Sequence, residues 1–410
     1  MNQRKRILLQ INASLNKGST GRIAEQIASL ARVHGWDTYM VHGARYVNES
    51  KMKTLQSVSL WGERLHAVKS MLFDAHGLGS AHATRRVISE IRRIKPDIIH
   101  LHNIHGYYLN YRILFEYLQS IDIPIVWTLH DCWTVTGHCS HFESIGCERW
   151  KVGCYNCPSK KDYPKSLLFD CSKRNFALKK SLFTSVKNMT IVPVSQWLGH
   201  ILKDSYLNKY SCRVINNGVD ISMFSPQESD LRSRLGIRDK IVLLGVATAW
   251  KNDKGLQEFI QLSEIPNYQV VMVGVSDEIK QMLPQSVIAI NRTNNQQELA
   301  EYYSMADMLV NPTYNDSFPT VNLEALACGT PIVTYRTGGS PESVTADTGI
   351  VVDKGDYSGL VAAIEDVISK GKQHYSKACR ERAVALYNKD ERFNDYIELY
   401  ESLYQLHIAR

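Results

Sequence analysis

Short runs of apolar, often β-branched residues alternate with segments of helical periodicity along the whole chain, and this alternation most constrains the fold. Alternating strands and helices form parallel sheets that helices cover on both faces. The first half is therefore predicted to be a doubly wound, Rossmann-like domain. Its expected strands are Ile7–Ile11, Thr38–Val41, Asp97–His102, Ile125–Leu129 and Ile191–Val194.

The same alternation starts again in the second half of the chain. Ser, Pro and charged residues interrupt the apolar periodicity at Asp220–Asp239, which indicates a domain boundary. Two domains suit a chain of 410 residues. We predict a first domain at 1–220, a second at 221–389, and a C-terminal helix at about 390–410 that packs back on the first domain. The later strands are expected at Lys240–Val246, Tyr268–Val273, Val287–Ile290, Met308–Val310 and Pro331–Tyr335.

Composition favours a cytoplasmic globular protein with an anionic partner for its first half. Ile7–Ile11 is too short for the apolar core of a signal peptide, and no stretch reaches the roughly 20 apolar residues that span a bilayer. Nine cysteines at irregular spacing make a poor disulfide framework. Residues 1–220 carry 30 basic and 16 acidic side chains, whereas residues 221–410 carry 18 and 25. A membrane surface, a lipid diphosphate or a nucleic acid would suit the basic half, and ordinary solvated charge is the alternative.

The stretch Asn315–Glu342, NDSFPTVNLEALACGTPIVTYRTGGSPE, is the most informative about function. A strand leads into a polar loop, and a helix is expected to begin near Pro319–Thr320. Unpaired backbone N–H groups at such a start, around Thr320 and Val321, can bind phosphate oxygens. Asp316 and Glu324 lie before and inside this helix. An acidic loop, with a carboxylate that complements the helix dipole, explains them equally well.

Asp316-x7-Glu324, followed by ALACGTPIV, resembles the acidic-x7-Glu segment of retaining GT-B glycosyltransferases, family 4. That family usually has Glu at the first position, where this chain has Asp316. The resemblance implies the GT-B fold, in which two Rossmann-like doubly wound parallel-sheet domains face a central cleft. It also implies that Glu324 binds the donor ribose and that Asp316 lies near the transferred sugar. The backbone beside the donor diphosphate would belong to Ser317, Phe318, Pro319, Thr320 and Val321.

Other segments match the same family in order along the chain. Asn16–Gly21 is similar to its glycine loop, so Gly18 and Gly21 are expected near the donor, although a plain strand-to-helix turn explains them too. Trp127–Asp131 resembles a family strand whose histidine, here His130, contacts the transferred sugar; a structural histidine is the alternative. Lys254, followed by Gly255, would neutralise the β-phosphate of the donor as the glycosidic bond breaks.

One family feature is missing near Lys254. The family usually has an arginine five or six residues earlier, where this chain has Thr248 and Ala249. Lys251 or Trp250 is a partial substitute, although lysine lacks the bidentate geometry of arginine.

The resemblance implies an enzyme that transfers a sugar, with retention, from a nucleotide-diphosphate sugar to a carbohydrate or lipid-linked saccharide acceptor. The expected setting is bacterial surface polysaccharide synthesis, either exopolysaccharide or lipopolysaccharide. Catalysis is expected to require no cofactor, and no Asp-x-Asp motif is present to bind a metal. The alternatives are a catalytically inactive GT-B-fold binding protein and a nucleotide-sugar epimerase. No nucleic-acid partner is expected.

A cysteine-rich segment follows His130. Cys139, Cys147, Cys154 and Cys157 could supply four thiolates to a structural zinc ion, and ordinary thiols are an equal alternative. The segment resembles an insert in a bacterial exopolysaccharide subgroup that includes the colanic acid type. We expect it to form a metal-braced loop beside the acceptor.

Two stretches, Leu60–Ile94 and Lys165–Val186, mix apolar and basic residues. Helices that face the core and keep a solvated basic face would explain them. The alternative is peripheral contact with the anionic inner face of the cytoplasmic membrane, close to a lipid-linked acceptor.

Overall fold

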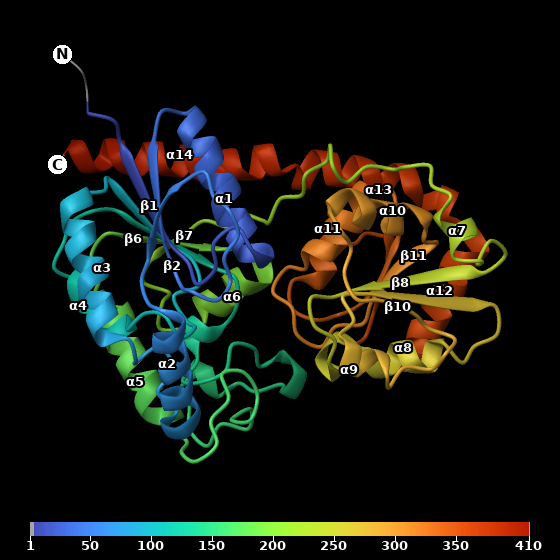
Figure 1. Cartoon of the computed structure of the whole chain (residues 1–410), viewed down its shortest axis with the longest axis horizontal. Coiled ribbons are helices and arrows are strands. Elements are labelled where there is room, and N and C mark those ends of the chain that lie inside the picture. The colour runs from blue at the N-terminus through green and yellow to red at the C-terminus, as the bar shows by residue number, and fades with distance from the viewer. Residues whose placement is uncertain (1–3, 410) are drawn as a thin grey trace. The chain divides into compact units, whose positions relative to one another are not determined.

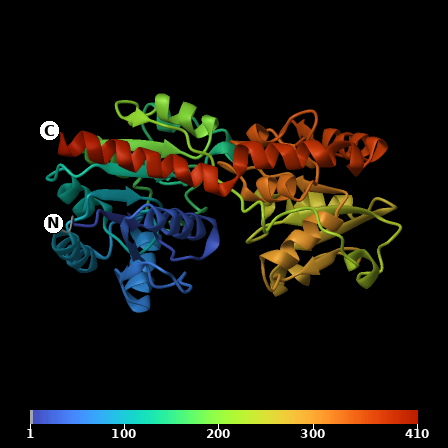
Figure 2. The ribbon, with the colours of Figure 1, turned by 90° about the horizontal axis from the view of Figure 1, so that it is seen from above.

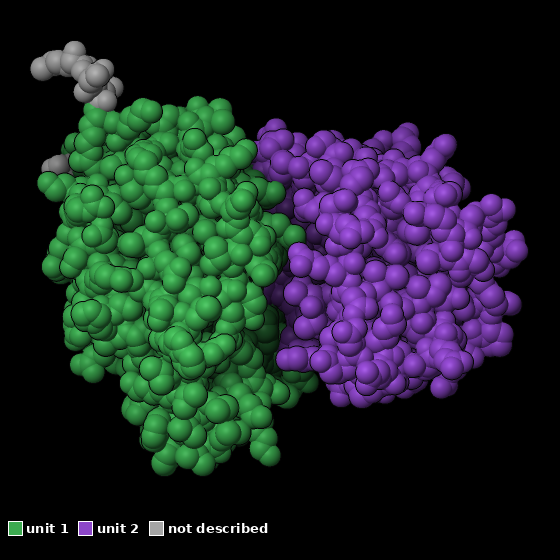
Figure 3. Space-filling model, in the orientation of Figure 1, with its two compact units in different colours: residues 1–216, 393–410 green, residues 217–392 purple. Residues whose placement is uncertain are grey.

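In the computed structural model, which describes residues 4–409, the chain divides into two compact units. Unit 1 comprises residues 1–216 and 393–410, and unit 2 comprises residues 217–392 (Figures 1 and 3). Each unit has its own sheet, and the chain returns to unit 1 only for its last helix.

Unit 1 contains a seven-stranded parallel sheet in the order β3-β2-β1-β4-β5-β6-β7. The order reverses between β1 and β4, which defines a doubly wound sheet with its switch point there. The strands are β1 Ile7–Ile11, β2 Asp37–His42, β3 Lys53–Gln56, β4 Ile98–Leu101, β5 Ile125–Leu129, β6 Met189–Pro193 and β7 Ser211–Cys212. Its helices are α1 Gly18–Val33, α2 Leu60–Phe73, α3 Ala81–Ile94, α4 Tyr111–Leu118, α5 Ser172–Phe183, α6 Gln196–Lys203 and most of α14 Lys389–Ile408.

Unit 2 repeats this architecture with a six-stranded parallel sheet, in the order β10-β9-β8-β11-β12-β13. The switch point lies between β8 and β11. The strands are β8 Ile241–Val246, β9 Tyr268–Val273, β10 Ile288–Ile290, β11 Met308–Asn311, β12 Ile332–Tyr335 and β13 Gly349–Val352. The helices are α7 Leu231–Arg234, α8 Leu256–Leu262, α9 Asp277–Lys280, α10 Gln296–Met305, α11 Thr320–Ala327, α12 Tyr357–Lys370 and α13 Lys372–Tyr387. The predicted pair of doubly wound parallel sheets is confirmed.

The last helix, α14, completes the core of unit 1. Its buried Phe393, Tyr396 and Tyr400 belong to the same apolar cluster as Leu8 of β1 and Trp36 before β2. Figure 2 shows α14 lying along this unit. The helix expected at about 390–410 begins at Lys389 in the structure, and Asn388, which forms a bridge with Val219, separates it from α13.

Candidate functional site

The loops that follow β8 and β11 meet at the switch point of unit 2, where ligands of doubly wound sheets bind. A short 3-10 helix, Asn252–Lys254, ends the first loop. Lys254 Nζ lies 2.8 Å from Asp316 Oδ2 in the second loop, and it also donates to the carbonyl of Asn315 at 2.9 Å. Both charged side chains are partly exposed, at 31% and 23%. The structure therefore brings together two residues that are 62 positions apart in the sequence. Both were predicted to contact the same donor, Lys254 at its phosphate and Asp316 at its sugar.

Glycine makes this close approach of the loops possible. Gly255 has φ +76°, and a Cβ there would lie 2.4 Å from Pro312 Cγ. Gly338, at φ +54°, packs against Asp316 from the other side, and a Cβ would overlap the Asp316 carbonyl. The Lys254–Asp316 pair is thus fixed by two backbone contacts that only glycine allows.

The start of α11 lies next to this pair. The helix begins at Thr320 with Pro319 as its N-cap, and no side chain caps it. Its first backbone N–H groups, which include those of Thr320 and Val321, have no partner within the helix. Ser317 Oγ is buried and has no hydrogen-bond partner among residues 4–409. Lysine, helix-start N–H groups and an unsatisfied hydroxyl together form a site suited to an anion.

Two predicted donor residues are largely buried in unit 2. Glu324 is 8% exposed and accepts a hydrogen bond from Tyr303 OH at 2.8 Å. Phe318 is 4% exposed, and its carbonyl accepts from the Asn217 side chain at 3.1 Å. These contacts fix the backbone before and within α11, so the site is built on a rigid element.

The expected substitute for the missing arginine is only partly supported. Trp250 is 5% exposed, packs against Phe259 and donates from its indole nitrogen to the Val273 carbonyl at 3.0 Å. It belongs to the core, so the interpretation of Trp250 as a phosphate ligand was wrong. The apolar indole gains more from burial than from a polar loop. Lys251, by contrast, is exposed.

In unit 1, a chain of hydrogen bonds leads from the sheet to the switch point between β1 and β4. Gln10 donates from its amide nitrogen to the Ala24 carbonyl at 2.9 Å, which turns its Oε1 toward His102 Nε2 at 2.8 Å. His102 Nε2 therefore carries the proton, and its Nδ1 accepts from His130 Nε2 at 3.2 Å. This leaves His130 Nδ1 as the nitrogen with an open lone pair.

The environment keeps this histidine chain neutral. Burial lowers the pKa of His130 to about 4 against the opposing effect of the Asp131 carboxylate, and it also holds the pKa of His102 well below its usual value. For Asp131, burial alone would raise the pKa, but the contact with His105 Nε2 at 2.7 Å and the hydrogen bond from the Trp133 backbone bring the pKa to about 2. A neutral imidazole next to a fixed carboxylate can accept a hydrogen bond from a sugar hydroxyl.

The predicted glycine loop forms the start of α1. Gly18 is its first residue and has φ +69°, which favours glycine. Gly21 lies on the inner face of the helix, where a Cβ would come within 2.8 Å of Ser14 Oγ. Both glycines thus shape the turn after β1, as a plain strand-to-helix turn requires, and their contact with a donor remains a prediction.

The four cysteines of the predicted zinc site line one pocket together with Phe142 and Trp150. However, residues 4–409 contain no group of three or more His, Cys, Asp or Glu side chains arranged to hold a metal ion. A zinc site is therefore not evident in the structure, and it remains a prediction.

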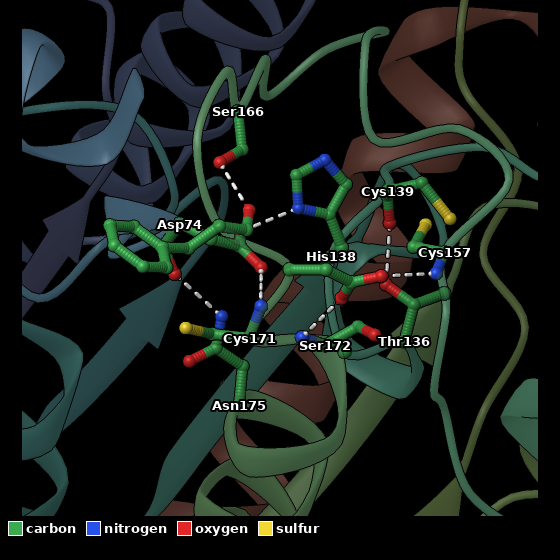
Figure 4. A network of polar contacts seen from close by, with 12 residues as sticks. Asp74, Thr136, His138, Cys139, Cys157, Ser166, Cys171, Ser172 and Asn175 are labelled. Carbon is green, nitrogen blue, oxygen red and sulfur yellow. Dashed lines mark hydrogen bonds and ion pairs between the residues drawn. The ribbon is translucent and has the colours of Figure 1, made fainter. Parts of the chain in front are cut away.

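A buried carboxylate, rather than a visible metal site, anchors the cysteine-rich segment (Figure 4). Asp74, directly after α2, pairs through Oδ1 with His138 Nδ1 at 2.6 Å and accepts from the Cys171 backbone at 2.6 Å. Asn175 of α5 donates to the Asp74 carbonyl at 2.7 Å. Both members of the Asp74–His138 pair are 1% exposed, so these contacts hold the long irregular segment against the unit 1 core.

Sequence reasoning missed the residues that orient the others. Gln10 is a polar residue inside the apolar run ILLQI, and this was an available signal of a buried polar role. His102 was predicted only as the last residue of the strand Asp97–His102. Tyr303 gave no signal, because an aromatic residue on a helix face is typical of a core position.

Comparisons with known proteins identify both halves of the chain. The family described as Glycosyltransferase Family 4 matches residues 21–223, and the family described as Glycosyl transferases group 1 matches residues 228–384. The chain is 23% identical over 411 aligned residues to an Escherichia coli (strain K12) protein named as a colanic acid biosynthesis glycosyl transferase, WcaC. This alignment covers 97% of the chain and 100% of its relative.

Solved structures share the fold over almost the whole length. Sucrose-phosphate synthase from Thermosynechococcus elongatus superposes with a TM-score of 0.75 at 18% identity, over 98% of this chain and 100% of that one. The Anabaena protein Alr3699/HepE, solved in complex with UDP, superposes with a TM-score of 0.67 at 16% identity, over 97% and 100%.

Proposed function

Since the chain belongs to glycosyltransferase family 4, a retaining family of nucleotide-sugar-dependent enzymes with the GT-B fold, we propose that it transfers a sugar from a UDP-sugar to a saccharide or lipid-linked saccharide. The proposed setting is the synthesis of a bacterial surface polysaccharide. The name of the WcaC relative supports this setting, and the complex of HepE with UDP supports the nucleotide.

The Lys254–Asp316 pair beside the open start of α11 carries the proposal. In the proposed mechanism Lys254 and the N–H groups of Thr320 and Val321 bind the diphosphate of the donor. Negative charge develops on that diphosphate as the glycosidic bond breaks, and donors placed in advance stabilise it without reorganisation. Asp316 orients Lys254, and Glu324, positioned by Tyr303, binds the ribose.

Unit 1 supplies the contact to the sugar in this proposal. His130 is neutral and presents Nδ1 as an acceptor, because His102 and Gln10 fix its other nitrogen. It would accept a hydrogen bond from a hydroxyl of the transferred sugar. The leaving diphosphate takes the proton of the acceptor hydroxyl, so His130 is assigned a positioning contact and no proton transfer.

The proposal is tested by comparing Lys254→Ala with Lys251→Ala in calorimetric titrations with UDP. Both changes remove one lysine from the same loop, but only Lys254 pairs with Asp316. A hydrogen bond to a charged group is worth about 1.5–3 kcal/mol, so Lys254→Ala should weaken UDP binding roughly 10- to 100-fold. Lys251→Ala should weaken UDP binding less than Lys254→Ala, because Lys251 is exposed and was expected to replace the arginine only in part. Equal affinity of wild type and Lys254→Ala would refute the assignment of the diphosphate site.

Product analysis separates a transferase from the alternatives. With UDP-sugar and a saccharide acceptor, release of UDP must depend on the acceptor, and the new linkage must keep the anomeric configuration of the donor. Conversion of the UDP-sugar without an acceptor would indicate an epimerase instead. Tight UDP binding without turnover of any sugar tested would favour a binding protein.

A further inference from the structure

Helix α2 turns its apolar side chains outward. Trp61, Leu65 and Val68 recur at helical spacing on one face and are 71%, 70% and 46% exposed. The buried residues of the helix are instead Glu63, His66 and Ser70. This is the reverse of a helix that packs on a core, so the predicted core-facing arrangement was wrong for α2.

Polar contacts explain why this inverted helix is stable on the domain. Glu63 Oε1 accepts from the Ala44 backbone at 2.6 Å, and its other oxygen lies 3.7 Å from Arg45. His66 accepts from the Gly79 backbone through Nε2 at 2.9 Å and contacts Ser80 Oγ at 2.9 Å through Nδ1. The inner face of α2 is thus satisfied by hydrogen bonds, and its apolar face is left to the outside.

A second exposed segment extends this apolar face. Leu167, Leu168 and Phe169 are 47%, 62% and 51% exposed, and the Leu167 backbone donates to the Met71 carbonyl at 2.7 Å. Phe169 stacks on Phe73, with ring centroids 5.9 Å apart. The two stretches that mix apolar and basic residues therefore meet in one surface, on which α2 and the loop before α5 lie side by side (Figure 1). We name it the α2 patch; it comprises Trp61, Leu65, Val68, Phe73, Leu167, Leu168 and Phe169.

Helix α5, from the second stretch, does not belong to the patch. Phe176, Leu182 and Phe183 are buried, and Lys179 is 2% exposed with its ammonium group donating to the Trp133 carbonyl at 2.7 Å. The core-facing interpretation is thus correct for α5. Exposed apolar residues are confined to the chain just before it.

Most of the exposed charges next to the α2 patch are basic. Arg64 and Lys69 are the exposed charged residues of α2, since Glu63 is buried, and Arg64 lies over the Trp61 ring at 5.0 Å. The exposed Lys165 lies two residues before Leu167, and the exposed Asp170 directly follows Phe169. Exposed apolar side chains beside lysine and arginine are typical of surfaces that insert into an anionic bilayer interface.

A groove of about 530 Å³ adjoins the α2 patch between α2 and the start of α3. Leu65 belongs to both the groove and the patch. Lys69 and Arg86 line the groove, which has no acidic residue in its wall, and α3 begins there without a side-chain cap. A lipid phosphate in this groove could bind Lys69, Arg86 and the first N–H groups of α3 while the apolar side chains of the patch insert into the bilayer.

We propose that the α2 patch docks unit 1 onto an anionic phospholipid surface, with a headgroup phosphate in the adjoining groove. A second copy of the chain fits less well, because Arg64 and Lys69 would face their own equivalents across a symmetric contact. This deepens the proposed function, on which it rests for a lipid-linked acceptor.

Flotation of the full chain with vesicles of phosphatidylcholine, with or without 30% phosphatidylglycerol, tests the proposal (a fraction of about 30% gives a strongly anionic surface). The wild type should float only with the anionic vesicles, and added salt should weaken its binding. Leu65→Ser/Leu168→Ser removes two exposed leucines from the patch. Because burying one leucine is worth about 1.5–3 kcal/mol, this variant should bind at least roughly tenfold more weakly. Val33→Ser/Met282→Ser, at two exposed sites elsewhere, should bind normally.

A third variant tests the groove. Lys69→Glu should reduce binding to anionic vesicles, whereas Lys377→Glu, at an exposed site in unit 2, should not. UDP titration of the same proteins keeps the two proposals apart, since all these variants should bind UDP like the wild type. The docking proposal is overturned if the wild type does not float with anionic vesicles at low salt. It is also overturned if Leu65→Ser/Leu168→Ser binds anionic vesicles like the wild type. The third contrary outcome is a wild type that sediments as a dimer and a variant that sediments as a monomer, with vesicle binding unchanged.

Discussion

At the scale of single residues, the site of unit 1 depends on the direction of its hydrogen bonds more than on the histidines alone. His102 can serve as donor or acceptor at either nitrogen, and Gln10 decides between these tautomers. Because Gln10 is itself oriented by the Ala24 carbonyl, the orientation of His130 is determined from inside the sheet.

Replacing Gln10 with leucine should therefore weaken catalysis without affecting donor binding. The change keeps the volume but removes the acceptor of His102 Nε2, so His102 can adopt the tautomer that leaves His130 without its acceptor. A net hydrogen bond is worth about 1 kcal/mol, so we expect kcat to fall roughly fivefold, with the Kd for UDP unchanged. Thr38→Val is the control, because it removes another buried polar group from the same sheet, a hydroxyl without a partner in the described part of the chain. Full activity of Gln10→Leu would show that the hydrogen bonds from Gln10 through His102 do not position His130.

At the scale of elements, the strands and the loop before α11 could be predicted because their signals are local. The run Ile125–Leu129 is buried along its whole length and β-branched, and the segment from Asp316 to Glu324 needs only a strand, a loop and a helix in sequence. The orientation of α2 could not be predicted, since its apolar stripe is also the pattern of a core-facing helix. The decisive contacts of Glu63 and His66 come from residues distant in the sequence.

The contact between the loops after β8 and β11, at the proposed donor site, leads to a prediction at this scale. Gly255 (φ +76°, ψ 28°) and Gly146 (φ +59°, ψ 33°) are both left-handed, but a Cβ collides with Pro312 at Gly255 and meets nothing within 4 Å at Gly146. An alanine in the left-handed region costs about 1–2 kcal/mol, so both Gly→Ala variants should melt at lower temperature. Only Gly255→Ala should displace Lys254 and weaken UDP binding, by at least about tenfold for a lost charged hydrogen bond. Calorimetry that shows equal affinities for the two variants would contradict this role of the contact.

At the scale of the whole molecule, unit 1 is completed by the end of the chain. His100 of β4 contacts Tyr400 OH at 2.6 Å across 300 residues of sequence, and Trp36 meets the same ring edge-on at 6.1 Å. A C-terminal helix could be predicted at about 390–410, close to the bounds of α14, but the break at Asn388 that precedes it could not. No glycine or proline marks that point, and the break depends on a bridge to Val219.

Two tyrosine substitutions should separate the stabilities of the two units. Tyr400 is fully buried in unit 1 and Tyr375 is 1% exposed in unit 2. Truncating a large buried aromatic ring to alanine costs about 3–5 kcal/mol, mainly through the cavity it leaves. In hydrogen exchange, Tyr400→Ala should deprotect the amides of β1 and β4 while those of β8 and β11 stay protected and UDP still binds. Tyr375→Ala should do the reverse and weaken the stabilisation by UDP, since the proposed nucleotide site lies in unit 2. If either substitution deprotects both sheets to the same extent, the two units unfold together, and the unit 1 core that α14 completes has no stability of its own.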